Sequence, residues 1–128
     1  MAKAPLAIAV TAVFTLAMIT RAADVPHISG GVGSDERDEL RAKERDYNFK
    51  VITARSSGDY LSGVVIVIES AAGERMLETT MAGPILLAKL PAGSYTIKAT
   101  VEEQTMTQTA TIQGQGLKQV HFRWGDRR

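Results

Sequence analysis

The sequence predicts an all-β fold, a seven-stranded antiparallel β-sandwich preceded by a short surface helix. Residues 95–101 alternate apolar and polar side chains, which is the period-two pattern of a half-buried strand. Pro91 and Gly93 occupy the second and fourth positions favoured in a type I turn, so a hairpin turn is expected just before that strand. Seven short segments of this kind, separated by turn residues, are typical of a sandwich.

The chain has 128 residues, a formal charge of +1 and no cysteine, which suits one globular domain at most. Residues 1–22 predict a signal peptide, because Lys3 precedes an apolar run, residues 6–19, that is too short to span a bilayer. Cleavage is expected after Ala22 or Ala23. Removing the signal lowers the net charge to −1, so no basic face for nucleic acid is implied. We expect a periplasmic or secreted protein without a membrane span after signal removal.

Residues 23–46 are expected to form an N-terminal arm and a short helix. The arm carries one proline and three glycines and predicts irregular structure. Ser34 is expected as the helix N-cap, and acids in the first turn with bases in the last turn match the helix dipole over residues 35–45. The helix interior has few apolar residues, of which Leu40 is the largest. The helix is therefore expected on the surface of the domain.

The sandwich is expected over residues 47–124, with a C-terminal tail at residues 125–128. The alternation places two side chains of the strand after the proline turn opposite two aromatic side chains of the last strand. With the turn itself, they are the predicted determinants of the fold: Pro91, Gly93, Tyr95, Ile97, Phe122 and Trp124. The strands are predicted at residues 47–54, 64–69, 74–80, 85–89, 95–101, 105–112 and 119–124.

One predicted strand, residues 64–69, has apolar side chains on both faces. Val65 and Val67 fall on the face opposite the core, where water-exposed strands normally carry polar residues. We expect the arm and the helix, through Leu40, to cover these valines in a monomer, and a homodimer is the alternative. The predicted interaction face is therefore Val65, Val67, Gly30, Gly31 and Leu40.

Several segments of the predicted sandwich resemble a known domain family. Residues 90–97, the Gly83-Pro84 pair and the second and last strands resemble the carboxypeptidase regulatory-like domains, which share the transthyretin-like (prealbumin-like) sandwich. The resemblance covers residues 47–124. Residues 28–33 and the acidic helix further resemble small exported proteins of Gram-negative bacteria that carry one such domain alone. The resemblance implies a fold and a compartment, and it implies no catalytic residues.

The sequence contains no recognisable catalytic motif. It lacks a cysteine nucleophile, a Gly-x-Ser-x-Gly elbow and a His-Glu-x-x-His zinc motif. His27 in the arm and His121 on the outward face of the last strand are too few for a zinc site, so no metal or cofactor is expected. The predicted function is a noncatalytic binding or accessory module of the bacterial cell envelope, with an envelope protein or a small ligand as partner. The alternative is a small periplasmic hydrolase of transthyretin-like fold that acts on a polar metabolite and uses His121.

Overall fold

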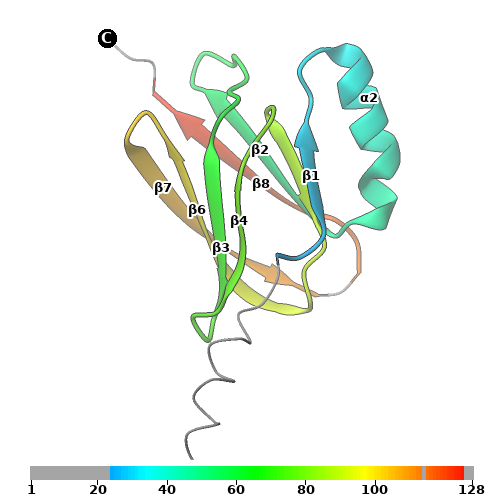
Figure 1. Ribbon diagram of the computed structural model, residues 1–128, viewed down its shortest axis with the longest axis vertical. Coiled ribbons are helices and arrows are strands. Elements are labelled where there is room, and N and C mark those ends of the chain that lie inside the picture. The colour runs from blue at the N-terminus through cyan, green and yellow to red at the C-terminus, as the bar shows by residue number, and fades with distance from the viewer. Residues whose placement is uncertain (1–23, 114, 126–128) are drawn as a thin grey trace, which may run out of the picture.

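The computed structural model describes residues 24–113 and 115–125 and contains two four-stranded sheets with one α-helix beside them (Figure 1). The predicted all-β sandwich is confirmed at this level. The predicted signal peptide, residues 1–22, and the tail beyond residue 125 lie outside the described residues. No helix within the described ranges is long and apolar enough to cross a membrane. The elements are β1 (His27–Gly30), α2 (Ser34–Lys43), the 3-10 turn η2 (Glu44–Asp46), β2 (Phe49–Arg55), β3 (Val65–Ser70), β4 (Arg75–Thr80), β5 (Ile85–Ala88), β6 (Gly93–Val101), β7 (Gln104–Ile112) and β8 (Lys118–Trp124).

The strand topology corrects the prediction of seven antiparallel strands. Sheet A has the order β1-β5-β2-β8, and sheet B has the order β4-β3-β6-β7. The described chain has eight strands, because part of the expected irregular arm, His27–Gly30, pairs antiparallel with β5. Strands β2 and β8 are neighbours that run parallel. Neither feature is visible in the local sequence, since each depends on which distant strand lies alongside.

The core lies between the two sheets and follows the predicted alternation. Ile97 is fully buried and Tyr95 nearly so, and both belong to one apolar cluster with Ile66 of β3 and the aromatic residues of β8. The rings of Phe122 and Trp124 stack with their centroids 6.0 Å apart. The inward phase predicted for the strands of β3, β6 and β8 is therefore confirmed, and burial of these large side chains is the main stabilising contribution.

The segment around Pro91 is not the predicted hairpin turn. It carries the chain from β5 in sheet A to β6 in sheet B, so the strands on either side do not pair. Tyr95 Oη donates a hydrogen bond to the Pro91 carbonyl oxygen at 2.6 Å, and the Asn48 side chain binds the backbone of Leu90. Gly93 begins β6 with a φ of 153°, a conformation that L side chains rarely adopt. The turn residues correctly indicate a change of direction, but packing decides which sheet the next strand joins.

Hydrogen bonds join the two sheets to each other along both lateral edges of the sandwich. On the β1 side, the Val25 N–H donates to the Met76 carbonyl oxygen at 3.1 Å. On the β8 side, Gln108 Nε2 donates to the His121 carbonyl oxygen at 2.5 Å. The edge strands of one sheet are thus tied to those of the other, which limits edge-to-edge association.

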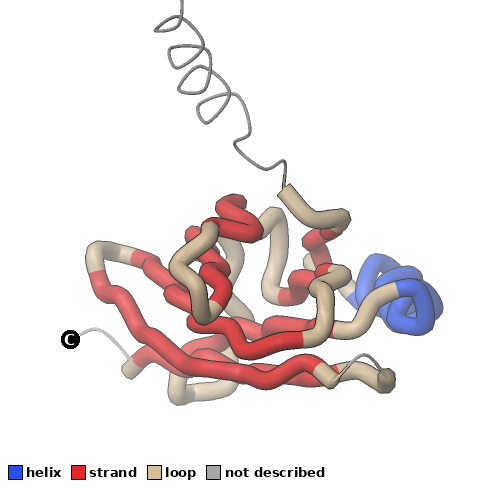
Figure 2. Tube along the Cα trace, turned by 90° about the horizontal axis from the view of Figure 1, so that it is seen from below, coloured by secondary structure: helices blue, strands red, loops and turns tan. Residues whose placement is uncertain are grey.

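Helix α2 packs on the surface of sheet A that faces away from the core (Figures 1 and 2). Leu40 is buried there against Ile85 and Leu87 of β5. The expectation that the arm and helix cover Val65 and Val67 is therefore wrong, because those valines belong to β3 in sheet B. All four apolar residues of β5 are buried, because the core covers one face of that strand and the helix covers the other.

The start of α2 also differs from the prediction. Gly33 is the N-cap residue, Ser34 is the first helical residue, and no side chain among the described residues caps the helix. Glu36 Oε1 instead accepts hydrogen bonds from the backbone N–H of Gly31 and of its C-terminal neighbour, at 3.0 and 2.8 Å. The predicted range, residues 35–45, agrees with α2 followed by η2. Glu36 thus ties the first turn of the helix to the segment before it and does not cap the helix N–H groups.

Candidate functional site

The side of the α2–η2 segment that faces sheet A carries Arg37, Leu40, Arg41 and Glu44, which are spaced i, i+3, i+4 and i+7. A helix that packs on a sheet normally presents an apolar stripe. Here Leu40 is the one apolar residue of the four, and the other three are charged. The helix therefore rests on the sheet through a single leucine, and a space remains beside it.

We call this space the helix pocket. It is a cavity of about 220 Å³ between α2 and sheet A. Ile52 and Ile85 contribute apolar surface to it, and Tyr60 from the loop after β2 contributes an aromatic ring. Lys50 of β2 and Gln119 of β8, which are register partners on the two parallel strands, add polar groups. The pocket combines an apolar lining with polar side chains that converge from two sheet strands and the helix.

Two of the charged side chains in the helix pocket are held in position by other residues. Lys50 Nζ lies 2.5 Å from Glu44 Oε2, and both side chains are largely buried. Arg37 Nη1 donates to the Gly31 carbonyl oxygen at 3.1 Å, and the Arg37 guanidinium lies 5.4 Å from the centre of the Tyr60 ring. These contacts reduce the freedom of both cations before any ligand arrives.

The third cation, Arg41, is held more loosely. Its side chain is 73% exposed, and its contact with Asp38 is a 3.5 Å surface ion pair. Such pairs contribute little stability, because water solvates both charges. Among the residues that line the pocket, three cations thus stand against one carboxylate, Glu44, which is already paired with Lys50.

The surroundings of His121 show no arrangement for nucleophilic catalysis. His121 is exposed, and its Nε2 lies 2.7 Å from the side-chain nitrogen of Gln119. No serine or carboxylate contacts its ring among the described residues, and His27 contacts a backbone carbonyl oxygen, that of Val25. Within residues 24–113 and 115–125, no group of three His, Cys, Asp or Glu residues could hold a metal ion. A hydrolase would need a base within reach of a nucleophile.

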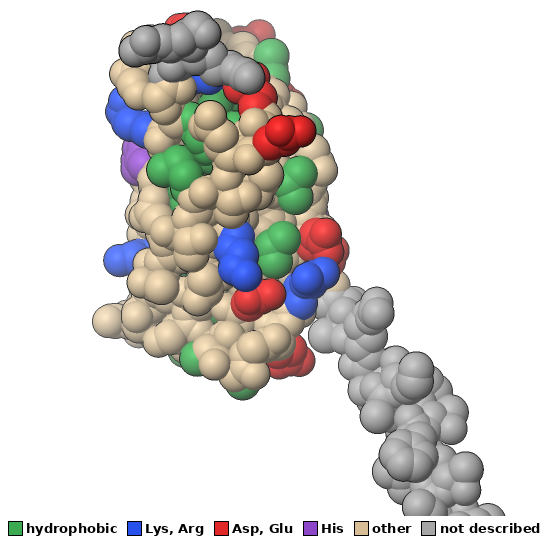
Figure 3. Space-filling view, turned by 90° about the vertical axis from the view of Figure 1, so that its left-hand side faces the viewer, with side chains coloured by type: hydrophobic (Ala, Val, Ile, Leu, Met, Phe, Trp, Pro, Cys, Tyr) green, Lys and Arg blue, Asp and Glu red, His purple; other side chains and the backbone are tan. Residues whose placement is uncertain are grey.

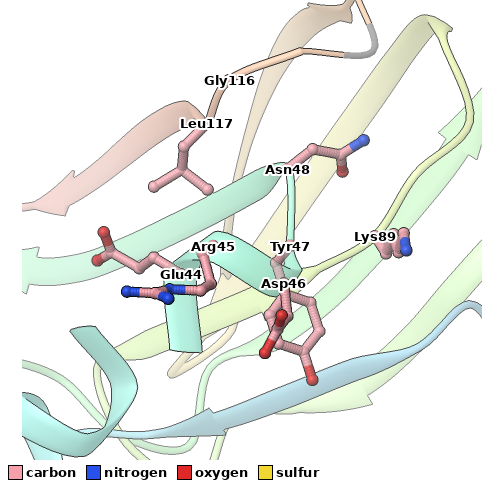
Figure 4. Close-up of a pocket in the computed structure, with 8 residues that line it drawn as sticks. All are labelled: Glu44, Arg45, Asp46, Tyr47, Asn48, Lys89, Gly116 and Leu117. Atoms are coloured by element: carbon pink, nitrogen blue, oxygen red, sulfur yellow. The ribbon is translucent and has the colours of Figure 1, made fainter. Parts of the chain in front are cut away.

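A second hollow lies at one end of the sandwich, where η2, the segment after β5 and the loop before β8 meet (Figure 4). It is a wide, open bowl of about 540 Å³. Glu44 and Arg45 lie on one side, and Lys89 lies on the other. Two acids and two bases line it, so its charge is balanced. Asn48, at its rim, already uses both ends of its amide to bind the backbone of Leu90. The bowl therefore has no excess charge that would attract a charged ligand, and its one side-chain amide is already occupied.

The structure does not bring the predicted interaction face together. Val65 and Val67 lie on the outer surface of sheet B, where Val65 is 36% exposed and Val67 is half-buried. Figure 3 shows that surface as mostly uncharged polar side chains and backbone, with only scattered apolar and charged groups. Gly30, Gly31 and Leu40 belong to the sheet A side of the molecule, and all three are buried. Of the predicted residues, Gly31 and Leu40 are connected with the helix pocket.

Sequence reasoning missed the charged residues that line the helix pocket. The arginine, leucine and glutamate spacing along α2 is visible in the sequence, but it resembles an ordinary solvated helix face. This spacing indicates a pocket only when sheet A lies opposite the helix. The helix lies there because it buries the side chains of β5 that point away from the core. No protein-family model matches the chain, and no curated protein shows detectable similarity to it. The function is therefore inferred from the geometry of the site.

Proposed function

We propose that this protein is a noncatalytic binding module of the bacterial cell envelope. In this proposal residues 1–22 are a signal peptide that exports the chain, and residues 47–124 form a carboxypeptidase regulatory-like (transthyretin-like) domain. The two-sheet sandwich and the Pro91 segment that precedes Tyr95 support the domain assignment. The basic and apolar pattern of the first residues supports export.

The observation that carries the binding function is the helix pocket. It lies on sheet A, two of its three cations are positioned by neighbouring residues, and none of its lining side chains is a hydroxyl or thiol nucleophile apart from the Tyr60 phenol. Concave sites with a few converging polar groups on an apolar lining are the usual ligand sites of proteins. The favoured partner is therefore a small ligand that enters this pocket.

A pocket-filling variant separates binding from catalysis. Ile52→Trp places an indole in the helix pocket, whereas Val67→Trp adds the same group to the outer surface of sheet B. Each protein is incubated with the low-molecular-mass fraction of an envelope extract, and retained molecules are identified by mass spectrometry. The original protein and Val67→Trp should retain a compound that Ile52→Trp does not. Equal retention by all three proteins would contradict the pocket as the site.

The hydrolase alternative is tested on the same preparations. A panel of ester, amide and phosphoester substrates should give no turnover above the buffer rate with the original protein. Turnover that disappears in His121→Ala would overturn the noncatalytic proposal, since His121 is the one histidine on the outer face of β8.

Export is tested separately by intact-mass analysis. Protein from its native host should begin at Ala23 or Asp24, and recovery of the full chain from the cytoplasm would contradict export.

A further inference from the structure

We propose that the helix pocket binds a small organic anion, with a carboxylate or phosphate group on Arg37 and Arg41 and a short apolar body against Ile52. This inference rests on the proposed binding function and specifies the chemical class of its ligand. It is argued from the charge, the available donors and the apolar surface of the pocket.

The charge of the pocket favours an anion. Its lining carries three cations and one carboxylate. Lys50 and Glu44 neutralise each other across 2.5 Å, so the two arginines supply the remaining positive charge. Asp38 is the nearest competing acid on the helix, but its 3.5 Å contact with Arg41 is exposed to water and easily exchanged for a ligand.

The arginines also have unused hydrogen-bond donors. Arg37 donates one guanidinium N–H to the Gly31 carbonyl oxygen. Its other N–H groups have no partner in the part of the chain that the structure describes. The hydrogen bond to Gly31 and the nearby Tyr60 ring restrain this guanidinium. A planar fork of donors that is already oriented matches the two oxygens of a carboxylate or phosphate group.

The rest of the ligand should be apolar and short. Ile52, Ile85 and Leu40 face the pocket, and the Tyr60 ring borders it. The cavity of about 220 Å³ is smaller than the roughly 300–1,000 Å³ of sites for drug-sized molecules. Gln119 at the β8 side can donate or accept one further hydrogen bond. An aromatic or short aliphatic acid combines these properties in one molecule.

Calorimetric titration with four probes of known chemistry tests the charge requirement. Benzoate has the proposed anion and apolar body, benzyl alcohol has the body without the charge, benzylamine reverses the charge, and inorganic phosphate has the charge alone. Benzoate should bind at least about tenfold more tightly than benzyl alcohol, because only benzoate offers the arginines a charged acceptor. Phosphate should bind more weakly than benzoate, and benzylamine should not bind.

Single variants locate the effect. Arg41→Gln should weaken benzoate binding about tenfold while leaving the fold intact, because among the described residues Arg41 contacts only Asp38, at the surface. Arg37→Gln should weaken it at least as much, but it also removes the Gly31 contact, so its thermal unfolding is measured in parallel. Lys43→Gln removes the same charge from an exposed site outside the pocket and should leave the affinity unchanged.

Each outcome decides between explanations. Equal affinity for benzoate and benzyl alcohol, with loss of both in Ile52→Trp, would overturn the anion inference and leave the binding module standing. Equal weakening by Arg41→Gln and Lys43→Gln would show nonspecific charge attraction and overturn it too. Phosphate binding as tightly as benzoate, with the same dependence on Arg41, would retain the anion site but overturn the apolar body. Binding of no probe would overturn the inference, while retention of an uncharged envelope compound would still support the proposed function.

Discussion

The side-chain amide of Asn48 binds both backbone groups of Leu90: Nδ2 donates to the Leu90 carbonyl oxygen, and Oδ1 accepts the Leu90 N–H, each at 2.8 Å. Asn48 immediately precedes β2, and Leu90 lies in the segment that leaves β5 for the other sheet. Leu90 is 2% exposed, so water cannot easily replace these bonds. The pair fixes the point where the chain passes from sheet A to sheet B.

Replacing this amide should destabilise the protein. Asn48→Ala leaves the Leu90 N–H and carbonyl oxygen without their partner, and each unsatisfied buried group costs about 1–3 kcal/mol. Urea unfolding measures the loss. Gln113→Ala, which removes an exposed amide near the same end of the sandwich, is the matched control and should change stability by less than about 0.5 kcal/mol. Equal effects of the two variants would contradict the structural role of Asn48.

The strand phase of β6 makes a second prediction. Ile97 is fully buried in the core, whereas Lys98 points outward with a half-exposed side chain. Ile97→Ala should lower the free energy of unfolding by about 2–5 kcal/mol, because it leaves a cavity. Lys98→Ala removes only a 3.7 Å surface contact with Glu69 and should be nearly silent. Equal effects of the two variants in urea melts would contradict the inward phase of Ile97.

Gly83 lies directly against Gly30 of strand β1, the strand that the sequence does not predict. A Cβ at this position would lie 2.4 Å from the carbonyl carbon and oxygen of Gly30. Relieving this clash would require the backbone itself to move. Gly83→Ala should therefore displace β1 and increase amide hydrogen exchange over His27–Gly30. Gly125→Ala has nothing within 4 Å of the added carbon and should leave that exchange unchanged. Full protection of His27–Gly30 in Gly83→Ala would contradict the observed path of the arm.

The predictable part of the fold is the part set by side-chain alternation. The alternation predicts the inward phase of Ile97 and Phe122, and their burial confirms it, because period two follows from strand geometry alone. The same rule predicts a cover for Val65, but the described residues leave this valine 36% exposed, and single exposed apolar side chains are common on protein surfaces. Strand β1, the parallel neighbours β2 and β8, and the helix pocket all depend on long-range packing. The sequence contains their residues, but it does not show which segments lie opposite one another.

Tyr95 predicts a dependence of stability on alkaline pH. Burial, with a smaller contribution from the carboxylate of Glu74, raises the pKa of Tyr95 above its ordinary value of 10.0. The unfolded chain then loses this proton at a lower pH than the folded chain, so stability should fall as pH rises above about 10. Tyr95→Phe should flatten this decline, although it also loses the bond to Pro91. Tyr60→Phe, at an exposed tyrosine, should retain it. Equal slopes of unfolding free energy against pH in the two variants would contradict the assignment.

The central claim is that ligands bind in the helix pocket and not on the outer surface of sheet B. Nuclear magnetic resonance of protein with labelled isoleucine and valine methyl groups tests it most directly. Titration with benzoate, and then with the low-molecular-mass fraction of an envelope extract, should shift the methyl signals of Ile52 and Ile85, which line the pocket. The signals of Val65 and Val67, on sheet B, should stay in place. Shifts at the two valines with unchanged Ile52 and Ile85 signals would contradict the account.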